Sequence, residues 1–276
     1  MRLGILGLGL IGGSLGYDLR ARGHRVVGVT RQAASAEKAV ALGAVDWGGT
    51  DLGLLAEAEV VFVCTPIGAL AASLEALKAV LDPATIVTDV ASVKGMVVPL
   101  AASLWPRFVG GHPMAGSAEQ GIDAAHPGLF IGRPYVLTPT AATDPTALAC
   151  VRSLVDDLQA QPIEMAPEVH DRAVARISHL PVLVSAALLL NLGDDPDGAA
   201  LASSGFFDTT RVGGGNPELG AAMAEFNRQA VLAELASYQK ALARLEHTVA
   251  TADWPTLTAL LATCRTLRAR VFPPTP

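Results

Sequence analysis

The sequence predicts an α/β protein in which a doubly wound parallel sheet precedes an all-helical part. From residue 2 to about residue 138, short β-branched runs alternate with helix-like stretches. Several of these runs are apolar throughout, as expected for strands that are buried on both faces. The strand pattern disappears after about residue 166. The length of 276 residues corresponds to about two domains.

Most of the expected strands are bounded by Gly, Pro or Thr, residues that favour turns and strand ends. In chain order they are Arg2–Leu6, Arg25–Thr30, Val60–Cys64, Thr85–Asp89, Phe108–Gly111 and Tyr135–Thr138. A helix over Pro145–Leu158 and an edge strand near Pro162–Met165 follow. Together these elements define a first domain of residues 1–165.

The second domain, residues 166–276, is expected to contain helices alone. They run from Pro167 to about Leu192, from Pro217 to about Ala250, and from near Trp254 onward. The second of them has a clear start, because Asn216 can cap it and Glu218 gives it an acidic first turn.

Composition and charge exclude several classes of protein. Hydrophobic residues make up 51% and charged residues 17%, against a usual charged share of about 25%, which excludes disorder over most of the chain. The net charge of −6 leaves no basic surface for nucleic acid or an anionic membrane. The longest apolar run, Leu180–Leu190, has 11 residues where a membrane span needs about 20, so we expect a buried core helix.

The number and spacing of the cysteines indicate the redox environment of the protein. Cys64, Cys150 and Cys264 lie far apart and in no C-x-x-C spacing, which excludes a disulfide framework and a zinc knuckle. A reducing cytoplasm is therefore the expected location. Glycines interrupt the apolar stretch Leu3–Gly13, and charged residues follow it, so we expect no signal peptide. The histidines show no ligand spacing, and no metal is expected.

The strongest local motif is Gly7-Leu8-Gly9-Leu10-Ile11-Gly12, which directly follows the first strand and opens a helix. Gly7 allows a tight turn, Gly9 lets the backbone approach a pyrophosphate, and Gly12 allows close helix–strand packing. The helix N-terminus offers free N–H groups and a partial positive charge to phosphate oxygens. A glycine-rich turn can be merely structural, but in this strand–turn–helix context we expect dinucleotide binding.

The end of the second strand bears on the choice of dinucleotide. NAD sites usually place Asp or Glu there, whereas this chain has Thr30 and Arg31. A carboxylate would repel a 2′-phosphate, and both of these side chains can donate to one. We therefore expect NADP, with NAD as a weaker alternative. The competing interpretation is that Arg31 is a solvated loop residue.

Further strand ends converge on the same crevice, because ligands of such folds bind outside the carboxyl ends of the strands. They carry Cys64-Thr65-Pro66, the loop Asp89–Lys94, and the segment Gly110–Gly116. Polar loops at strand ends are common, but a histidine beside two glycines is more specific. We expect His112 to be functional, although a structural histidine with a local partner would fit the same pattern.

The helical domain offers two further candidates. Arg172, Arg176 and His179 share one expected helix face; His179 lies in the most apolar part, where it faces either a cleft or solvent. The segment Asp208–Arg211 places a cation next to the flexible Gly213–Gly215 loop. That pattern suits a carboxylate ligand and suits a solvated arginine equally well.

Taken together, these motifs resemble the prephenate/arogenate dehydrogenases. The segments that carry the resemblance are Gly7–Gly12, Asp89–Lys94, Gly111–Gly116, Ser178–Pro181 and Asp208–Arg211. It extends from residue 1 to about residue 250, and the H-P-M-A-G and S-H-L-P segments are specific. The pattern is most similar to the short, NADP-linked arogenate dehydrogenases. The resemblance implies an N-terminal Rossmann-type domain, an all-helical dimerisation domain and a role in tyrosine biosynthesis.

The resemblance also implies an oxidative decarboxylation of a cyclohexadienol that carries a ring carboxylate. It makes His112 the base or hydrogen-bond acceptor and Ser92 the residue that orients it. It assigns the substrate carboxylate to His179 and Arg211. Gly213 is expected at the substrate because the carbonyls of the Gly213–Gly215 loop can accept from an ammonium. Two departures matter: Val182 replaces a second histidine of prephenate-specific relatives, and Phe207 replaces a basic residue. Both lower the positive charge near the substrate side chain, which favours the ammonium of arogenate over the keto group of prephenate.

Other functions remain open at this stage. Prephenate dehydrogenase or dual-substrate activity is the nearest alternative. A different nicotinamide enzyme, a hydroxyacid dehydrogenase or imine reductase, is another; a lysine base on the first C-terminal helix would favour the former, and no lysine lies between Lys94 and Lys240. A non-catalytic dinucleotide sensor would not need His112 and Ser92. We also expect a homodimer, because apolar residues of the long helix recur at spacings of four and three: Val231, Leu235, Tyr238, Leu242, Leu245 and Val249.

Overall fold

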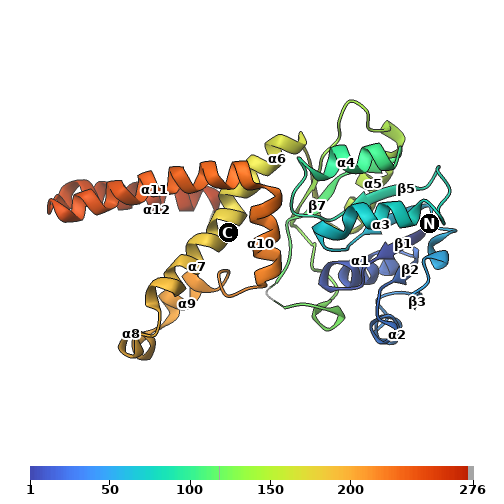
Figure 1. Ribbon diagram of the computed structural model, residues 1–276, viewed down its shortest axis with the longest axis horizontal. Coiled ribbons are helices and arrows are strands. Elements are labelled where there is room, and N and C mark those ends of the chain that lie inside the picture. The colour runs from blue at the N-terminus through green and yellow to red at the C-terminus, as the bar shows by residue number, and fades with distance from the viewer. Residues whose placement is uncertain (118, 273–276) are drawn as a thin grey trace. The chain divides into compact units, whose positions relative to one another are not determined.

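The structure is a computed structural model that describes residues 1–117 and 119–272 (Figure 1). It divides into two compact units, Met1–Arg228 and Gln229–Pro276. The first unit contains the strands together with the helices up to α10, and the second contains two long helices. A domain boundary after residue 165 stays a prediction.

The centre of the first unit is a parallel sheet with the strand order β3-β2-β1-β4-β5-β6. Its strands are β1 (Arg2–Leu6), β2 (Arg25–Val29), β3 (Trp47–Gly49), β4 (Val60–Val63), β5 (Ile86–Asp89) and β6 (Phe108–Val109). Leu6 at the end of β1 pairs with Val29 on one side and Val63 on the other, so three strands end level. The order reverses beside β1, and ligands bind outside the strand ends at such a point.

Helices cover both faces of this sheet, as the apolar strands predict. They are α1 (Leu10–Ala21), α2 (Ala33–Ala41), α3 (Leu70–Leu77), α4 (Val97–Leu104) and α5 (Pro145–Asp157). Neighbouring strand residues point to opposite faces, so Ile5 and Phe62 belong to one buried cluster. Leu6 and Val63 belong to the other. The predicted doubly wound α/β architecture is confirmed.

The last strands differ from the prediction, because they form a separate sheet. Its members are β7 (Gly111–Pro113), β8 (Pro134–Leu137) and β9 (Gln161–Glu164), with β7 antiparallel and β9 parallel to β8. The expected strand Phe108–Gly111 breaks at Gly110, where a Cβ would lie 2.4 Å from Oγ1 of Thr138 and 2.7 Å from Val98. The chain leaves the first sheet at this glycine and enters the second with His112.

The helical part of the first unit begins with a continuous stretch from Pro167 to Leu192, as predicted. It consists of α6 (Pro167–Val174), a π-helical turn (Ala175–His179) and α7 (Leu180–Leu192). Three shorter helices follow: α8 (Pro196–Leu201), α9 (Ser204–Thr210) and α10 (Pro217–Phe226). Asn216 caps α10 by accepting from the backbone N–H of Glu218 at 2.9 Å.

Two expectations for these helices are wrong. The helix from Pro217 does not run unbroken to Ala250 but stops at Asn227, whose side chain bonds to the backbone of Asp171 instead. The expected buried core helix is only half-buried within one chain; Ile177 is 64% exposed and Leu190 is 82% exposed. By length and composition alone, Pro167–Leu192 could cross a membrane. Its first half, however, buries His170, Asp171 and His179.

The second unit contains α12 (Trp254–Val271) and most of α11 (Arg228–Ala250), joined by residues 251–253. Asp253 caps α12 by accepting from the N–H of Thr256 at 3.1 Å, so the predicted start of the final helix is confirmed. Large apolar side chains of both helices are exposed in the single chain, among them Leu242, Val249, Leu261 and Leu267.

Candidate active site

The turn between β1 and α1 gives its three glycines three different environments. Gly7 has φ +107°, and a Cβ on it would lie 2.7 Å from the carbonyl oxygen of Cys64. A Cβ on Gly12 would lie 2.0 Å from the carbonyl oxygen of Gly7. Gly9 meets nothing within 4 Å of its Cβ position, and no side chain caps α1 at this end. The turn is therefore tightly packed at Gly7 and Gly12 and open at Gly9, which leaves room for a pyrophosphate to approach the backbone.

The neighbouring strand ends lie at the same edge of the sheet. Thr30 is half-buried after β2, and its N–H donates to the carbonyl of Gly49 at 3.0 Å, while Arg31 is exposed. After β4, the hydroxyl of Thr65 lies 3.1 Å from that of Ser73. Burial and the nearby Asp89 raise the pKa of the Cys64 thiol, so Cys64 stays protonated. Thr30, Cys64 and Thr65 therefore border the crevice as uncharged groups. Arg31 supplies a positive charge at the end of β2.

A buried ion pair fixes the strand that carries His112. Asp89 and Lys94 are both fully buried and paired, and Asp89 also accepts from the N–H of Gly111 at 3.0 Å. Burial lowers the pKa of Lys94, and the attraction of Asp89 opposes that shift. Asp89 thus ties the end of β5 to the start of β7, one residue before His112. The position of this loop at the crevice is predictable from the sequence, but its ion pair is not, because no local pattern marks Asp89 and Lys94 as buried partners.

His112 is half-buried, and its ring is hydrogen-bonded to a chain of buried groups on α6. Its Nδ1 lies 2.8 Å from Nε2 of His170, and Nδ1 of His170 lies 2.8 Å from a carboxylate oxygen of Asp171. Asp171 in turn accepts from the backbone N–H groups of Lys94 at 2.7 Å and Gly95 at 2.8 Å. Burial is the main reason that the pKa of His112 lies well below 6.5, with His170 as the next cause.

His179 joins this cluster because of the π-helical turn. In a regular α-helix, residues nine positions apart are separated by about 2.5 turns and point in opposite directions. The wider turn over Ala175–His179 brings His179 to the buried side with His170, whereas Arg172 and Arg176 are exposed. The expectation that His179 shares a face with these two arginines is therefore wrong.

The hydrogen bonds of His179 show which ring nitrogen carries its proton. Asn227 Nδ2 donates to the carbonyl of Asp171 at 2.8 Å and lies 3.3 Å from Nδ1 of His179. An amide NH₂ only donates, so Nδ1 accepts and the proton is on Nε2. Burial lowers the pKa of His179 to about 4, while Asp171 opposes the shift. His179 is therefore neutral at pH 7 and offers one N–H.

Two polar atoms of this cluster have no partner of normal geometry within the described part of the chain. They are Nε2 of His179 and Oγ of Ser92, and both are buried. The Ser92 backbone lies beside His179 and raises its pKa, against the effect of burial. A buried donor and hydroxyl without partners are groups that a polar ligand can satisfy.

The remaining predicted substrate residues lie elsewhere. Arg211 is exposed where α9 ends, and in the described residues no hydrogen bond or ion pair links it to His112 or His179. Gly213 donates its N–H to Oγ of Ser185 at 2.8 Å, and a Cβ there would lie 2.4 Å from the Ala186 nitrogen. This glycine lets its loop pack against α7. Of the two departures from the family, Phe207 is 67% exposed and Val182 is half-buried.

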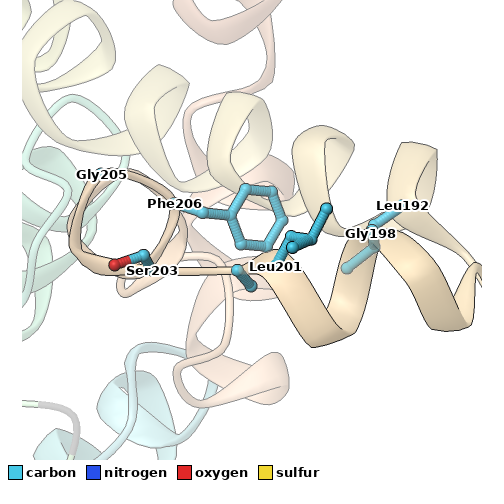
Figure 2. A pocket seen from close by; sticks show the side chains of 7 residues that line it. Leu192, Gly198, Leu201, Ser203, Gly205 and Phe206 are labelled. Atoms are coloured by element: carbon cyan, nitrogen blue, oxygen red, sulfur yellow. The ribbon is translucent and has the colours of Figure 1, made fainter.

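A separate pocket of about 400 Å³ lies between the end of α7, α8 and α9 (Figure 2). Its lining residues are Leu192, Gly198, Leu201, Ala202, Ser203, Gly205 and Phe206. None of these side chains titrates near neutral pH, so the pocket offers no acid–base chemistry. Within residues 1–117 and 119–272, no group of three or more His, Cys, Asp or Glu residues is arranged to hold a metal ion.

The sheet order, the open glycine turn and the buried histidine cluster at the strand ends define a class of two-domain dehydrogenases that bind a nicotinamide dinucleotide. The chain belongs to the prephenate dehydrogenase family. Residues 15–164 match the family model for the prephenate dehydrogenase nucleotide-binding domain. Residues 166–263 match the model for the prephenate dehydrogenase dimerization domain.

Individual relatives agree with this family. A prephenate dehydrogenase of Bacillus subtilis is 34% identical over 226 residues, which cover 78% of this chain and 61% of that protein. The crystal structure of Synechocystis arogenate dehydrogenase is 50% identical with a TM-score of 0.85, covering 98% of this chain and 100% of that one. The A. aeolicus prephenate dehydrogenase complex with hydroxyphenyl propionate and NAD⁺ is 28% identical with a TM-score of 0.93, covering 98% of each chain.

Proposed function

We propose that this chain is an arogenate dehydrogenase that converts L-arogenate to L-tyrosine with NADP⁺ by oxidative decarboxylation. The observation that carries the proposal is the placement of His112. His170 and the Asp89–Gly111 bond hold this histidine at the edge of the sheet where the glycine turn opens. The 50% identity to Synechocystis arogenate dehydrogenase over nearly the whole chain supports the same assignment.

The reaction needs one base and one hydride acceptor. The bound dinucleotide supplies the acceptor for the hydride that leaves the hydroxyl-bearing ring carbon. His112 takes the hydroxyl proton on its Nε2, which makes no hydrogen bond to the described protein groups. The bond to the ring carboxylate then breaks, CO₂ leaves, and the electron pair enters the ring. The resulting phenolate oxygen takes the proton back from His112. General base catalysis of this kind contributes roughly 10²- to 10⁴-fold.

The groups around the base suit a polar ring substrate. Nε2 of neutral His179 and the hydroxyl of Ser92 make no hydrogen bond within the described residues, so both are available to a substrate. We propose that Ser92 binds the substrate hydroxyl beside His112 and that His179 donates to a substrate oxygen. Arg211, at the end of α9, is proposed to hold a carboxylate once substrate is bound. Gly213 is proposed to line the same region, although its own N–H is engaged by Ser185.

The choice of NADP rests on the end of β2. Arg31 is exposed there, and no Asp or Glu follows the strand directly. The A. aeolicus relative was solved with NAD⁺, so membership of the family does not decide the cofactor. An exposed guanidinium beside the ribose site favours the additional phosphate of NADP, with NAD as the weaker alternative.

The choice of arogenate rests on low positive charge near the side-chain site. His179 is neutral, Val182 cannot donate a hydrogen bond, and Phe207 carries no charge. An ammonium is not repelled in such surroundings, whereas a keto oxygen has fewer donors. Prephenate remains the alternative substrate, in line with the names of the Bacillus and A. aeolicus relatives. Val182→His adds a donor and should raise kcat/KM for prephenate relative to arogenate.

We also propose a homodimer formed through the C-terminal helices. The matching dimerization model and the exposed apolar side chains of α11 and α12 support it. A cytoplasmic location stays a prediction drawn from the separate cysteines.

The decisive experiment mixes the purified protein with NADP⁺ or NAD⁺ and with arogenate or prephenate. Absorbance of the reduced nicotinamide gives the rate, and chromatography identifies the aromatic product. We expect the highest kcat/KM with arogenate and NADP⁺, and tyrosine as product. A kcat/KM for prephenate equal to that for arogenate would overturn the substrate choice. No reduction with either ring compound would overturn the proposed function.

A further inference from the structure

His112 is joined to two buried residues for which the reaction as described has no role. His170 is fully buried and Asp171 is 8% exposed, and both come from the first turns of α6. The rings of His112 and His170 meet edge to face, with centroids 5.1 Å apart and planes at 73°. Their facing nitrogens lie 2.8 Å apart, a normal hydrogen-bond distance. One of these two nitrogens must therefore donate and the other must accept.

The environment of Asp171 fixes the direction of this hydrogen-bond chain. Its two carboxylate oxygens accept from the backbone N–H groups of Lys94 and Gly95, and one also faces Nδ1 of His170. In these hydrogen bonds both oxygens act as acceptors. Nδ1 of His170 therefore carries a proton. In the neutral imidazole, Nε2 of His170 is then an unprotonated acceptor.

The same donor–acceptor argument fixes the protonated nitrogen of His112. Because Nε2 of His170 accepts, Nδ1 of His112 must carry the proton. The unprotonated nitrogen of neutral His112 is then Nε2, the edge that is free of protein hydrogen bonds in the described residues. With both imidazoles neutral, a single arrangement of protons satisfies the whole chain from Asp171 to His112.

We infer that His170 and Asp171 are positioning residues that hold His112 in the tautomer whose Nε2 can accept the substrate proton. The inference rests on the proposed function for its kinetic consequence. When the proton of the substrate hydroxyl arrives on Nε2, His112 becomes an imidazolium whose Nδ1–H still donates to His170. No proton moves beyond His112. His170 keeps its proton toward the carboxylate of Asp171, and the chain stabilises the new charge, as an oriented histidine–aspartate pair does in a catalytic triad.

A spectroscopic test addresses the tautomer directly and does not depend on activity. Protein labelled with ¹⁵N-histidine is studied by NMR, in which protonated and unprotonated ring nitrogens resonate in separate ranges. The His112→Gln variant identifies the signals of His112. We expect Nδ1 of His112 to be protonated and Nε2 to be unprotonated in the wild type. His170→Phe, which keeps a ring but removes the acceptor, should give a mixture of both tautomers. A wild-type proton on Nε2, or an unchanged tautomer in His170→Phe, would overturn the inference.

Kinetics provide the second readout. His170→Phe should lower kcat by about 10- to 100-fold, part of the contribution of a well-oriented base, and leave the Kd for the dinucleotide within about twofold. His170→Gln should recover most of kcat, because its side-chain oxygen can accept from Nδ1 of His112. A merely structural role would give no such recovery. If His170→Phe does not fold, His170→Leu removes the same acceptor and takes its place in both measurements.

The chain offers a matched control. His24 and Asp157 form another histidine–aspartate pair, with Nε2 of His24 at 3.0 Å from a carboxylate oxygen, on residues that do not contact His112. His24→Phe should change neither the tautomer of His112 nor kcat. Equal losses of kcat in His24→Phe and His170→Phe would mean that the effect is one of stability. If the wild type turns over neither ring compound, the proposed function fails, while the NMR experiment still decides the tautomer.

Discussion

Nε2 of His170 lies 2.8 Å from Nδ1 of His112, although 58 positions separate the two residues in the chain. One residue comes from a strand of the small sheet and the other from the first turn of α6. The contact therefore joins the dinucleotide-binding part to the helical part. It also gives the proposed base a buried partner on one nitrogen and leaves the other for substrate.

The first prediction concerns His112 itself. His112→Ala should lower kcat by roughly 10²- to 10⁴-fold, because it removes the base, and should leave dinucleotide affinity unchanged. Burial, His170, Lys94 and His179 lower the pKa of His112, so the wild type keeps its base unprotonated below pH 6.5. The acidic limb of kcat/KM should therefore fall below that pH. A loss of less than tenfold, or an acidic limb at or above pH 6.5, contradicts the assignment.

The second prediction separates the two dinucleotides. Arg31→Ala should weaken NADP⁺ binding by about 10- to 100-fold, the range expected for losing a hydrogen bond to a charged group. NAD⁺ affinity should stay nearly unchanged, because NAD⁺ lacks the 2′-phosphate. Arg25→Ala is the control, since Arg25 is an exposed arginine at the opposite end of β2. Fluorescence titration gives both affinities, and equal effects of Arg31→Ala on them would show that Arg31 does not meet the phosphate.

The third prediction concerns the substrate carboxylate. Arg211→Ala should raise KM for the ring substrate by about tenfold or more, through loss of a charge-assisted contact, with little effect on NADP⁺ affinity. Arg172→Ala removes another exposed arginine and serves as the control. Steady-state kinetics at saturating NADP⁺ provide the measurement. An unchanged KM would make Arg211 a solvated surface residue.

The fourth prediction links His179 to acid stability. Its pKa is lowered to about 4 in the folded protein and is about 6.5 when unfolded, so the unfolded chain binds the extra proton first as the pH falls. The stability contribution is complete above pH 6.5 and is lost toward pH 4, by about 3 kcal/mol. Urea unfolding across this range should show the loss in the wild type and a shallower one in His179→Gln. Identical pH profiles would contradict the buried neutral state.

The fifth prediction is the homodimer. Light scattering at micromolar concentration should give twice the mass of 28.4 kDa. The physical reason is the exposed apolar surface of the C-terminal helices, where Leu242 and Val249 are 51% and 55% exposed. Replacing both with glutamate should lower the apparent mass. A monomeric mass for the wild type would end the proposal.

The sequence by itself determined the features that depend on local pattern. The glycine turn is readable because Gly7 and Gly12 satisfy constraints of their own strand and helix. The strands β1, β4 and β5 are readable because they are almost entirely buried: β4 is apolar throughout, β1 is apolar after Arg2, and β5 begins with two β-branched apolar residues. Helix starts at Pro167, Pro217 and Trp254 follow from their proline and capping residues. Short β3 was missed because Trp47-Gly48-Gly49 has no β-branched run.

Only the tertiary structure determined which residues of the site are hydrogen-bonded to one another. His170 is not recognisable as a site residue from the sequence, because nothing in the local pattern indicates its partner in a strand 58 positions away. Asn227 ends a helix that periodicity would continue, since its amide bonds to Asp171 and faces His179. The π-helical turn rotates His179 to the buried side, and periodicity assumes a regular helix. Buried polar groups must find partners wherever the fold brings them, so their pairing is fixed by packing and not by spacing.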